Sequence, residues 1–560
     1  HIENDSLHEI LNKKDFALSA YAKRLTLEAS MINESDIVTL RQYGINDGEI
    51  LAKYENDSVA AVYNEFGMGA CYVLGPDFRE LIYRNQIDAD VSAHRTYSNG
   101  FEPTSDVICF WVRNIVRKHI PHLVHKYTIP GDASSVMLMT HDIDSRSAMD
   151  TMQLFSDYEK EELVPSQYNI TTRYFNDALM SNFYVGTSAL ITEVINDGHT
   201  LASHSVGHFP DYADDNLFPF GTLGNTFANY QPSHFGSQTS DGTILGELEV
   251  SKDLLELDHN VEIKSFRAGH LAYPDSLGAG LELTGYEFNS THSANNILTA
   301  FPYYVPAKQS FTTSMTNVLE IPMTISDVFN SDPINSTNYI SKVNIWNTVI
   351  QKNAQNNAPT VLLIHPNRNY KLTALQNVLA NLPENTSTYP FEKFGDFWID
   401  RMNTNYYTST QNDTLNVFFN TMVNSDQTFI VDAQNLDTVL FYNEVNQPLY
   451  YKANAFNSTQ KIYFKSSPTQ TNLNLNFDEN IVISPNPNNG TFNIKTDIEL
   501  INPSLKLYSI LGNEVFVTKV ATIKDNYLLD LSELNLTDGI YKLMIETKDK
   551  SIAKNIVIKR

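Results

Sequence analysis

Cysteine is almost absent from this sequence: the 560 residues contain only two, Cys71 and Cys109. One bridge between them could form, but two cysteines are too few for the disulfide framework that holds small exported domains together. Unpaired cysteine behaves as a small apolar residue, so we expect both side chains to be buried. The length of the chain predicts three or four domains.

Long apolar runs and an excess of positive charge are also missing. No run of about 18 apolar residues occurs, so the sequence predicts no transmembrane helix. Lys and Arg number 39 against 65 Asp and Glu, a formal net charge of −26. This balance argues against nucleic acid or an anionic membrane surface as a partner and suits a soluble secreted protein. The chain opens at His1 without a signal peptide, so we expect either that a leader was removed or that the sequence begins internally.

The stretch from Met137 to Asp144 is an apolar run that ends in two carboxylates. Such a run is typical of a buried strand, and we expect it to emerge at the C-terminal edge of a sheet or barrel, where α/β folds place ligands and catalytic groups. Asp142 and Asp144 would point to the same side and repel each other unless a cation or proton lies between them. A loop or helix cap after the strand is the alternative interpretation.

Two later stretches carry histidines. His204 and His208 are four residues apart, which would put both imidazoles on one face of a helical turn. Two histidines and a carboxylate form a common open site for zinc or a similar divalent ion. The apolar run Val361 to Ile364 reads as another strand and leads to His365, although that side chain could also face solvent or cap a helix.

Together these stretches resemble the motifs of the polysaccharide deacetylases, the NodB-homology group of metal-dependent carbohydrate esterases. The variant first motif, Asp-x-Asp, stands at Asp142–Asp144, and the second, His-Ser-x-x-His, at His204–His208. The third, an arginine near a proline, is matched loosely by Arg267 and Pro274, and the last, Leu-x-His, ends at His365. Order and spacing both match, and the second motif is the most specific.

The resemblance implies a role for each matched residue. Asp142 would be the general base, Arg267 would orient it and keep it ionised, and His365 would be the general acid. A divalent metal, expected to be Zn²⁺, would be held by three ligands: Asp144, His204 and His208.

The sequence departs from the family pattern in two places. The third motif lacks the usual Arg-Pro-Pro-Tyr form, and the Asp-rich fourth motif that tunes the catalytic histidine is not visible. The stretch Gly285 to Thr291 lies where the fourth motif should be, so Glu287 could substitute for it, or the tuning group comes from elsewhere. Both departures bear on the substrate more than on the chemistry.

The long stretch between His208 and Asp241 is rich in aromatic residues and has few helix or strand signals. So many aromatic side chains argue against disorder, and long ordered loops are often functional. We expect Tyr212 and Tyr230 to stack on sugar rings in the substrate cleft, and Tyr273 beside the third motif to bind substrate as well. The alternative is that the aromatic residues of this loop fill a satellite core.

Residues 1–130 are expected to form an α/β accessory region. Apolar periodicity predicts helices over Leu7–Leu27 and Asp106–Tyr127, with short strands between Gly48 and Gly75. The strand and glycine-turn pattern weakly resembles part of a glutamine-amidotransferase-like domain that lacks a nucleophile, which suggests that the native chain begins earlier.

Residues 131–400 are the deacetylase-like region. The pattern predicts a second strand over 164–170, a helix over Ile191–Asp197, an amphipathic helix over Ile244–Leu257 and a strand over Ile263–Phe266. Alternating strands and helices indicate parallel pairing with right-handed crossovers. The resemblance implies an α/β fold, a distorted (β/α)7 barrel with its site at the C-terminal mouth.

The remainder of the chain reads as two small all-β domains. Residues 401–478 show short strands at regular spacing, typical of a β-sandwich that could be a carbohydrate-binding module or a spacer. Residues 479–560 resemble the C-terminal sorting domain of the type IX secretion system, through Ile483–Phe492, Leu507–Gly512 and Asp538–Tyr541. This resemblance implies recognition by the type IX secretion machinery and a secreted or outer-surface location.

The sequence therefore predicts a secreted metal-dependent deacetylase acting on an acetylated glycan, with N-acetyl groups of amino sugars preferred over O-acetyl esters. Related folds cut other C–N amide bonds, so a non-sugar amidohydrolase is a second interpretation. A catalytically inactive surface carbohydrate-binding protein is a third. Retention of every matched catalytic and metal residue counts against it, because an inactive member would be expected to lose at least one.

Overall fold

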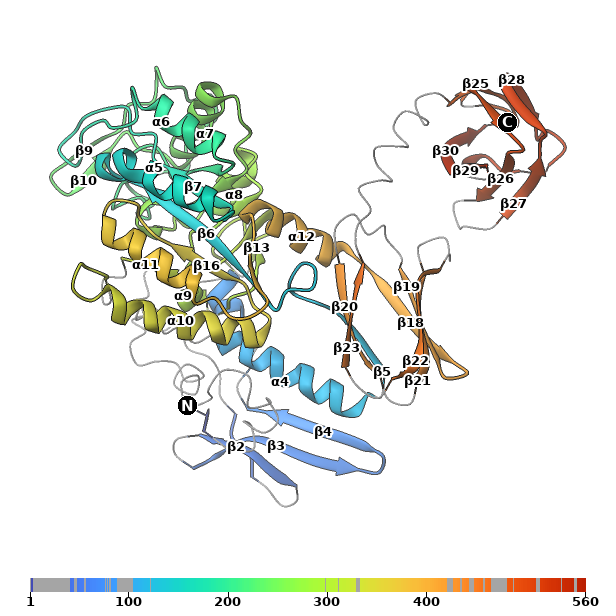
Figure 1. Cartoon of the computed structure of the whole chain (residues 1–560), viewed down its shortest axis with the longest axis horizontal. Helices are drawn as coiled ribbons and strands as arrows, with labels where there is room; N and C mark the ends of the chain where they lie inside the picture. The colour runs from blue at the N-terminus through green and yellow to red at the C-terminus, as the bar shows by residue number, and fades with distance from the viewer. Residues whose placement is uncertain are drawn as a thin grey trace. The chain divides into compact units, whose positions relative to one another are not determined.

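The computed structural model divides the chain into two compact units, residues 1–465 and 466–560 (Figure 1). It describes residues 2–3, 41–44, 48–54, 57–75, several between 77 and 87, 104–120, 122–297, 299–310, 312–328, 333–419, 427–433, 436–442, 448–456, 459–464, 481–486, 488–509, 514–534, 536–547 and 551–559. The helix expected over Leu7–Leu27 lies outside these residues.

The centre of the first unit is a 10-stranded sheet in the order β13-β14-β12-β11-β8-β7-β6-β16-β15, with β17 also paired to β6. All pairs are parallel except β13 with β14. The strands are β6 (Ser135–Ile143), β7 (Ser166–Ile170), β8 (Thr200–Ser203), β11 (Ser265–Phe266), β12 (Phe288–Asn289), β13 (Tyr303–Pro306), β14 (Met315–Glu320), β15 (Ile325–Ser326), β16 (Thr360–Leu363) and β17 (Thr386–Thr388). Every residue of β6 is buried, as its continuous apolar run predicts.

The sheet curls because the stretch from β14 to β15 changes partner. β14 pairs with β12, whereas β15 pairs with β16. Between them the Met323 N–H donates to the His292 carbonyl and the Thr324 N–H donates to the Val361 carbonyl. One continuous stretch therefore joins the two sides of the sheet, and the carboxyl ends of its parallel strands face a common mouth. The region is a mixed α/β fold with a curled sheet, which agrees with the expected fold class at this level.

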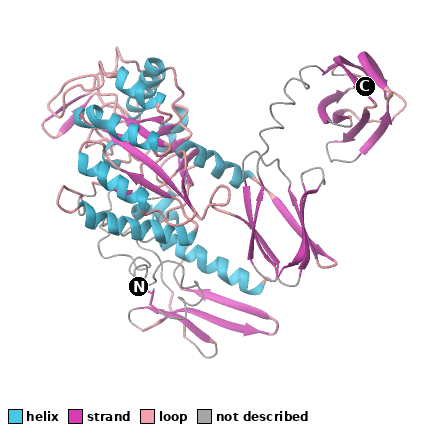
Figure 2. Ribbon diagram, viewed as in Figure 1, coloured by secondary structure: helices cyan, strands magenta, loops and turns pink. Residues whose placement is uncertain are grey.

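Helices lie around the outside of this sheet (Figure 2). They are α5 (Arg146–Glu161), α6 (Ser188–Asn196), α7 (Ile244–His259), α8 (Leu277–Leu283), α9 (Ala294–Ile297), α10 (Tyr339–Asn356), α11 (Asn369–Ala380) and α12 (Phe391–Asn403), with the short turn η3 (Gly269–Leu271). The strand and helices expected over 164–170, Ile191–Asp197 and Ile244–Leu257 are present as β7, α6 and α7, and the strand expected over Ile263–Phe266 is present as β11.

The helix expected over Asp106–Tyr127 is wrong at its end. It stops at His119 as α4 (Thr104–His119), and the chain continues as the strand β5 (His122–Lys126). Pro121 supplies the reason, because proline has no N–H to donate and disfavours helical backbone in the preceding residue. Leu123 and Val124 therefore belong to a strand.

An antiparallel sheet precedes α4: β1 (Ile2–Glu3), β2 (Glu49–Tyr54), β3 (Val59–Phe66) and β4 (Gly69–Leu74), with η2 (Tyr83–Ile87) following. Its inner face packs on Ile108 and Trp111 of α4. Both cysteines are free and exposed, contrary to expectation. Cys109 lies between the buried Ile108 and Phe110, so it falls on the outer face of α4.

Two further sheets are formed mainly by strands that follow the 10-stranded sheet in the sequence. One contains β18 (Tyr406–Gln411), β19 (Thr414–Phe419), β21 (Leu436–Tyr442) and β22 (Pro448–Phe456); the other contains β23 (Thr459–Phe464), β20 (Gln427–Ala433) and β5. Both contribute to one hydrophobic cluster that includes Val124, Phe429 and Phe441. These sheets therefore include β5, a strand that precedes the 10-stranded sheet in the sequence and lies outside the range 401–478.

The second unit is built from strands in two sheets. The first holds β24 (Ile481–Ser484), β25 (Thr491–Ile501) and β28 (Thr522–Asp530); the second holds β27 (Glu514–Lys519), β26 (Ser504–Ser509), β29 (Gly539–Glu546) and β30 (Ser551–Ile558). They share a hydrophobic core of their own. Across the described parts of both units, no helix has the length and apolar character needed to cross a membrane.

Candidate active site

A pocket of about 330 Å³ opens where the central parallel strands end. Its walls gather side chains that are far apart in the sequence, because parallel strands bring their carboxyl ends to one edge of a sheet. The lining residues are Asp142, Asp144, His204, His208, His270, Leu271, Ser326, Val328, Leu363 and His365. All the expected metal ligands and both proton-transfer residues are among them.

Asp142 is held in place through one carboxylate oxygen. Its Oδ1 accepts hydrogen bonds from Asn169 Nδ2 at 2.6 Å and from Arg267 Nη1 at 3.0 Å. Its Oδ2 lies 3.6 Å from His204 Nε2, beyond hydrogen-bonding distance. Burial by itself would raise the pKa of this carboxyl, but His204, Arg267, His365 and the Asn169 hydrogen bond outweigh it and hold the pKa well below its usual range. Asp142 is therefore ionised and leaves Oδ2 for the pocket.

Arg267 is the fixed partner of Asp142. The side chain is fully buried, and its Nη1 also donates to Thr140 Oγ1 at 2.9 Å. Its Nε and Nη2 donate to the carbonyl and hydroxyl oxygens of Ser290, each at 2.9 Å. These contacts leave the guanidinium no freedom to turn away, so the structure brings Arg267 and Asp142 together as a buried ion pair.

The histidine pair lies on a loop, and the expected helical turn is wrong. Ser205 and His208 both have positive φ, at 65° and 50°, which no right-handed helix allows. The rings of His204 and His208 nevertheless lie with their centroids 5.0 Å apart. His204 Nδ1 donates to the Arg267 carbonyl at 2.8 Å, so its Nε2 faces the pocket without a proton. Burial lowers the pKa of both rings and keeps them neutral.

His365 follows β16 and is tuned by Asp327, a residue that sequence reasoning missed. Its Nδ1 donates to Asp327 Oδ1 at 2.7 Å, and Lys371 Nζ lies 2.6 Å from Asp327 Oδ2. Burial would lower the pKa of His365, but the Asp327 charge and hydrogen bond, with Asp144 and Asp142, raise it to about 9. Asp327 directly follows β15, and the two-residue length of that strand left no signal in the sequence.

Glu287, the substitute considered for the tuning group, has another partner. Its carboxylate lies 2.9 Å from Lys264 Nζ, and 43% of its side chain is exposed. It does not line the pocket. The tuning group therefore comes from elsewhere in the chain, which was the other alternative.

The donor chemistry of the pocket fits a divalent cation, although the ligands are not converged. In the described part of the chain, no three His, Cys, Asp or Glu side chains are gathered closely enough to form a metal cluster. Instead, His208 Nε2 and Asp144 Oδ2 face each other at 3.9 Å, too far for a hydrogen bond. Neutral imidazoles with Nε2 toward a carboxylate are the donor types that zinc binds. Asp144, His204 and His208 therefore suit zinc chemically.

His270 and Leu271 line the pocket although neither was expected there. Both have positive φ, 56° and 54°, and the His270 ring lies 4.3 Å from the ring of His208. A Cβ on Gly269 would come within 2.6 Å of the His208 ring, so only glycine lets this turn approach. Strained backbone of this kind often marks a functional site. The signal that could have found them is their place three and four residues after Arg267.

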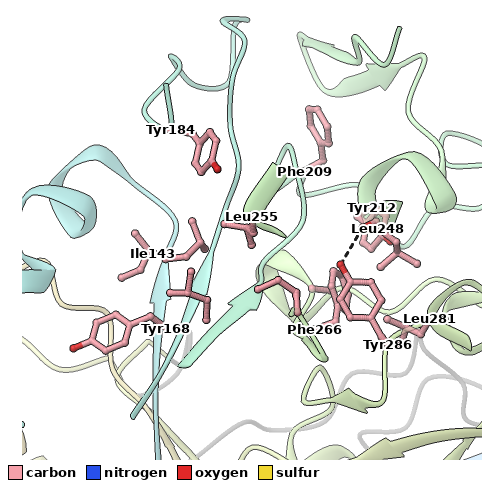
Figure 3. Packing of buried hydrophobic residues seen from close by; sticks show 14 of the residues in the cluster. Ile143, Tyr168, Tyr184, Phe209, Tyr212, Leu248, Leu255, Phe266, Leu281 and Tyr286 are labelled. Atoms are coloured by element: carbon pink, nitrogen blue, oxygen red, sulfur yellow. Dashed lines mark hydrogen bonds between the residues drawn. The ribbon is translucent and has the colours of Figure 1, made fainter. Parts of the chain in front are cut away.

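The structure does not bring Tyr273, Tyr212 or Tyr230 to the pocket, so their expected contact with substrate is corrected. Tyr273 is buried and stacks on His292 with ring centroids 4.0 Å apart. Tyr212 lies in the main core beside Leu248, as Figure 3 shows. Tyr230 packs against Val206 in a smaller cluster. Buried rings cannot stack on a sugar; the position of Tyr230 agrees with the satellite-core interpretation, whereas Tyr212 belongs to the main core.

Comparison with known proteins identifies the second unit. Residues 482–559 match the model of the family described as "Secretion system C-terminal sorting domain". The second unit is therefore a type IX sorting domain, which indicates that the chain is secreted or held at the outer cell surface. The search of curated proteins found no match to the chain.

Solved structures of polysaccharide deacetylases are among the structural neighbours of the chain. One, assigned as a polysaccharide deacetylase of Mycobacterium smegmatis, is 15% identical and aligns over 49% of this chain and 93% of its own, with a TM-score of 0.35. The Xyl-CE4 domain of a multidomain xylanase from the hindgut metagenome of Trinervitermes trinervoides is 15% identical over 48% and 92%, with a TM-score of 0.29. The catalytic domain of a peptidoglycan N-acetylglucosamine deacetylase from Eubacterium rectale is 13% identical over 45% and 86%, with a TM-score of 0.26. Likenesses this distant carry no argument about activity, which depends on the site residues.

Proposed function

We propose that the chain is a metal-dependent carbohydrate deacetylase that hydrolyses N-acetyl groups of amino sugars in an acetylated glycan. The observation that carries this proposal is the meeting of Asp142, Asp144, the His204–His208 pair and His365 in one pocket. These residues come from three separate strand ends and match the family motifs in order. We take the fold as a distorted (β/α)7 barrel, with β14 and β15 counted as one bent strand.

Asp144, His204 and His208 would hold the cation in this proposal. When bound, a divalent metal such as Zn²⁺ would polarise the acetyl carbonyl and make a water molecule more acidic. The side chains around the proposed ligands orient them and set their protonation states. His204 is oriented through the Arg267 carbonyl, which leaves its Nε2 available, and the neutral state of His208 leaves one of its ring nitrogens without a proton.

The two proton transfers are assigned to Asp142 and His365. Asp142 Oδ2, the oxygen that Asn169 and Arg267 leave free, accepts the proton of the attacking water. His365 carries a proton on Nε2, which lies 3.5 Å from Asp144, and gives it to the leaving nitrogen as the C–N bond breaks. Its Nδ1 proton stays on the hydrogen bond to Asp327 and fixes the ring. The products are acetate and a free amine.

The glycan would contact the pocket residues that remain. His270, Leu271, Ser326 and Val328 line the pocket and have no part in the proton transfers. They replace the three tyrosines as the proposed substrate contacts.

The experiment that tests the function measures acetate release from a panel of N-acetylated and O-acetylated glycans. The protein is first stripped of metal and then assayed with and without added zinc. Zinc-dependent acetate from an amino-sugar polymer is the expected result. No acetate from any glycan, with zinc demonstrably bound, would overturn the proposal and favour a non-sugar amidohydrolase or an inactive carbohydrate-binding protein.

Two variants separate an enzyme from a binding protein. Asp142→Asn should lose at least about 100-fold in turnover, because an amide cannot accept the water proton, while its zinc affinity is retained. Asp144→Ala should lose both turnover and zinc, since it removes a proposed ligand. Zinc content by atomic absorption and acetate release by coupled assay give the two readings. Full turnover by Asp142→Asn would show that the base lies elsewhere.

A further inference from the structure

We propose that Arg173 and Glu247 form a buried clamp that positions the histidine loop, residues 204–208, for metal binding. The inference rests on the proposed function, because it concerns how that site keeps its metal ligands in place. Neither residue lines the pocket, and both are fully buried. Two buried charges that take no part in the chemistry need a reason to be there, since burying a charge is costly unless it is well paired.

The histidine loop has a backbone that would not persist without support. Ser205 and His208 are both left-handed, and such a conformation costs about 1–3 kcal/mol for each residue that is not glycine. Gly207 between them has no room for a side chain, because a Cβ would lie 1.9 Å from the ring of Phe209. The loop therefore depends on outside contacts to bring the two rings to their 5.0 Å separation.

Glu247 supplies one side of the clamp from α7. Its Oε2 accepts the N–H groups of Val206 at 2.9 Å and of Gly207 at 2.8 Å. Its Oε1 accepts the hydroxyl of Tyr230 at 2.9 Å, which fixes the carboxylate. One turn further along α7, the Ser251 hydroxyl donates to the Ser205 carbonyl at 3.2 Å. One helix face thus binds consecutive peptide groups of the loop.

Arg173 supplies the other side from the segment after β7. Its Nη1 donates to the Gly207 carbonyl at 2.6 Å, the opposite end of the residue whose N–H Glu247 binds. The guanidinium is fixed in turn by Asp177 and by its position over the ring of Phe175, 4.4 Å from the centroid. The N–H donors of the loop between the histidines are therefore bound by the carboxylate of Glu247, and the Gly207 carbonyl is bound by the guanidinium of Arg173.

Metal binding requires more precise placement of the ligand side chains than the stability of the fold does. Loss of the clamp should therefore lower zinc affinity more than it lowers the stability of the protein. Groups behind metal ligands typically change affinity by about 10-fold to 100-fold when they are removed. Glu247→Ala would leave two buried N–H groups unsatisfied, and Arg173→Met would leave the Gly207 carbonyl unsatisfied. In Glu247→Gln the amide oxygen can still accept both N–H groups, and the amide N–H can donate to the hydroxyl oxygen of Tyr230.

The test measures zinc affinity of the full chain by competition with a chromophoric chelator, and the visible spectrum of the Co²⁺-substituted protein. We expect Glu247→Ala and Arg173→Met to weaken zinc binding by about 10-fold or more and to change the Co²⁺ bands. Glu247→Gln should stay within about threefold of the wild type. Tyr184→Phe is the matched control: it removes a 2.7 Å hydrogen bond to Asp258 of the same helix without touching the loop, and its affinity should not change.

The outcomes separate this inference from the proposed function. Wild-type protein that binds no zinc would remove the proposed function, and the clamp with it. Wild-type binding with unchanged affinity in Arg173→Met and Glu247→Ala would overturn the clamp alone. If one of these two variants fails to fold, the other gives the same decision, because each removes one side of the clamp; zinc affinity equal to that of Tyr184→Phe would then overturn the clamp.

Discussion

Charged side chains at the candidate active site are buried beside charged partners, and these contacts set their protonation states. Arg267 holds Asp142, and Asp327 holds both His365 and Lys371. In each case the partner fixes an orientation as well as a protonation state. A buried ion adds little net stability when it is paired but is costly when its partner is removed.

Arg267→Met should therefore destabilise the first unit by about 3–5 kcal/mol, because the buried carboxylate of Asp142 loses its counter-charge. Adding Asp142→Asn to the same chain should recover part of that loss, since no charge is then left unpaired. Urea unfolding, followed by the fluorescence of the three tryptophans, reports on this unit because all three lie in it. Equal midpoints for Arg267→Met and the wild type would show that the pair does not depend on this arginine.

Another buried carboxylate, Asp106 of α4, predicts a pH dependence of stability. Burial raises its pKa from 3.8 to about 7, although it accepts hydrogen bonds from Thr299 and Ala300. Between these two values the unfolded chain releases the proton while the folded chain keeps it. Stability should therefore fall as the pH rises from about 4 to 7 and change no further from this group above 7.

Asp106→Asn removes this titration and can still donate to Thr299 and accept from Ala300. The variant should match the wild type near pH 4 and exceed its stability increasingly toward pH 7, by at most about 4 kcal/mol. Urea midpoints of both proteins at pH 4.5 and pH 8 measure the difference. A constant difference at the two pH values would contradict the raised pKa.

At the scale of elements, the site depends on where strands end rather than on the strands themselves. The ends of β6, β8, β11, β15 and β16, with the residues that follow them, supply its acids, bases and their partners, while the strands themselves are buried. The strand β5 pairs with a strand that lies far from it in the sequence. It is antiparallel to β20, and its Val124 lies in the hydrophobic core of the sheets formed by residues 406–464.

Val124→Asp should therefore unfold a region that begins about 280 residues further along the chain. The new carboxylate would be buried without a partner in a hydrophobic core, at a cost of several kcal/mol. Limited proteolysis should then cleave within residues 406–464. Ile120→Asp, a change at a side chain that is 45% exposed, is the control and should leave cleavage unchanged. Equal protection in both variants would argue against a shared core.

At the scale of the molecule, export and chemistry reside in separate units. The sorting domain lies in the second unit and has its own core, whereas every residue of the proposed active site lies in the first. Separate cores mean that one unit can fold when the other is absent.

Deletion of residues 482–559 should keep the chain inside a host that has type IX machinery, while the wild-type chain reaches the medium or the outer surface. Immunoblots of the cell fractions measure the distribution. The purified truncated protein should release acetate at the wild-type rate, within about twofold, because the pocket is unchanged. Export of the truncated chain would show that another segment carries the sorting signal.

The sequence determined the parts of this protein that are local. An apolar run with carboxylates at its end indicates a buried strand, which singled out Asp142 and Asp144 before any fold was known. The spacing of His204 and His208 singled out the histidine pair, His365 ends another apolar run, and the motif resemblance added Arg267. The sorting domain was likewise readable from short contiguous strings, and the family match bears it out.

Only the tertiary structure decided which residues meet across long separations. Asp327 reaches His365 from the position directly after a two-residue strand, and β5 pairs with β20 although about 300 residues separate them in the sequence. The histidine loop takes left-handed backbone because Arg173 and Glu247 bind its peptide groups, so its four-residue spacing gave no guide to its shape. The positions of the three tyrosines could not be read from the sequence either. An aromatic ring can fill a hydrophobic core or line a substrate cleft, and only its burial in the folded chain distinguishes the two.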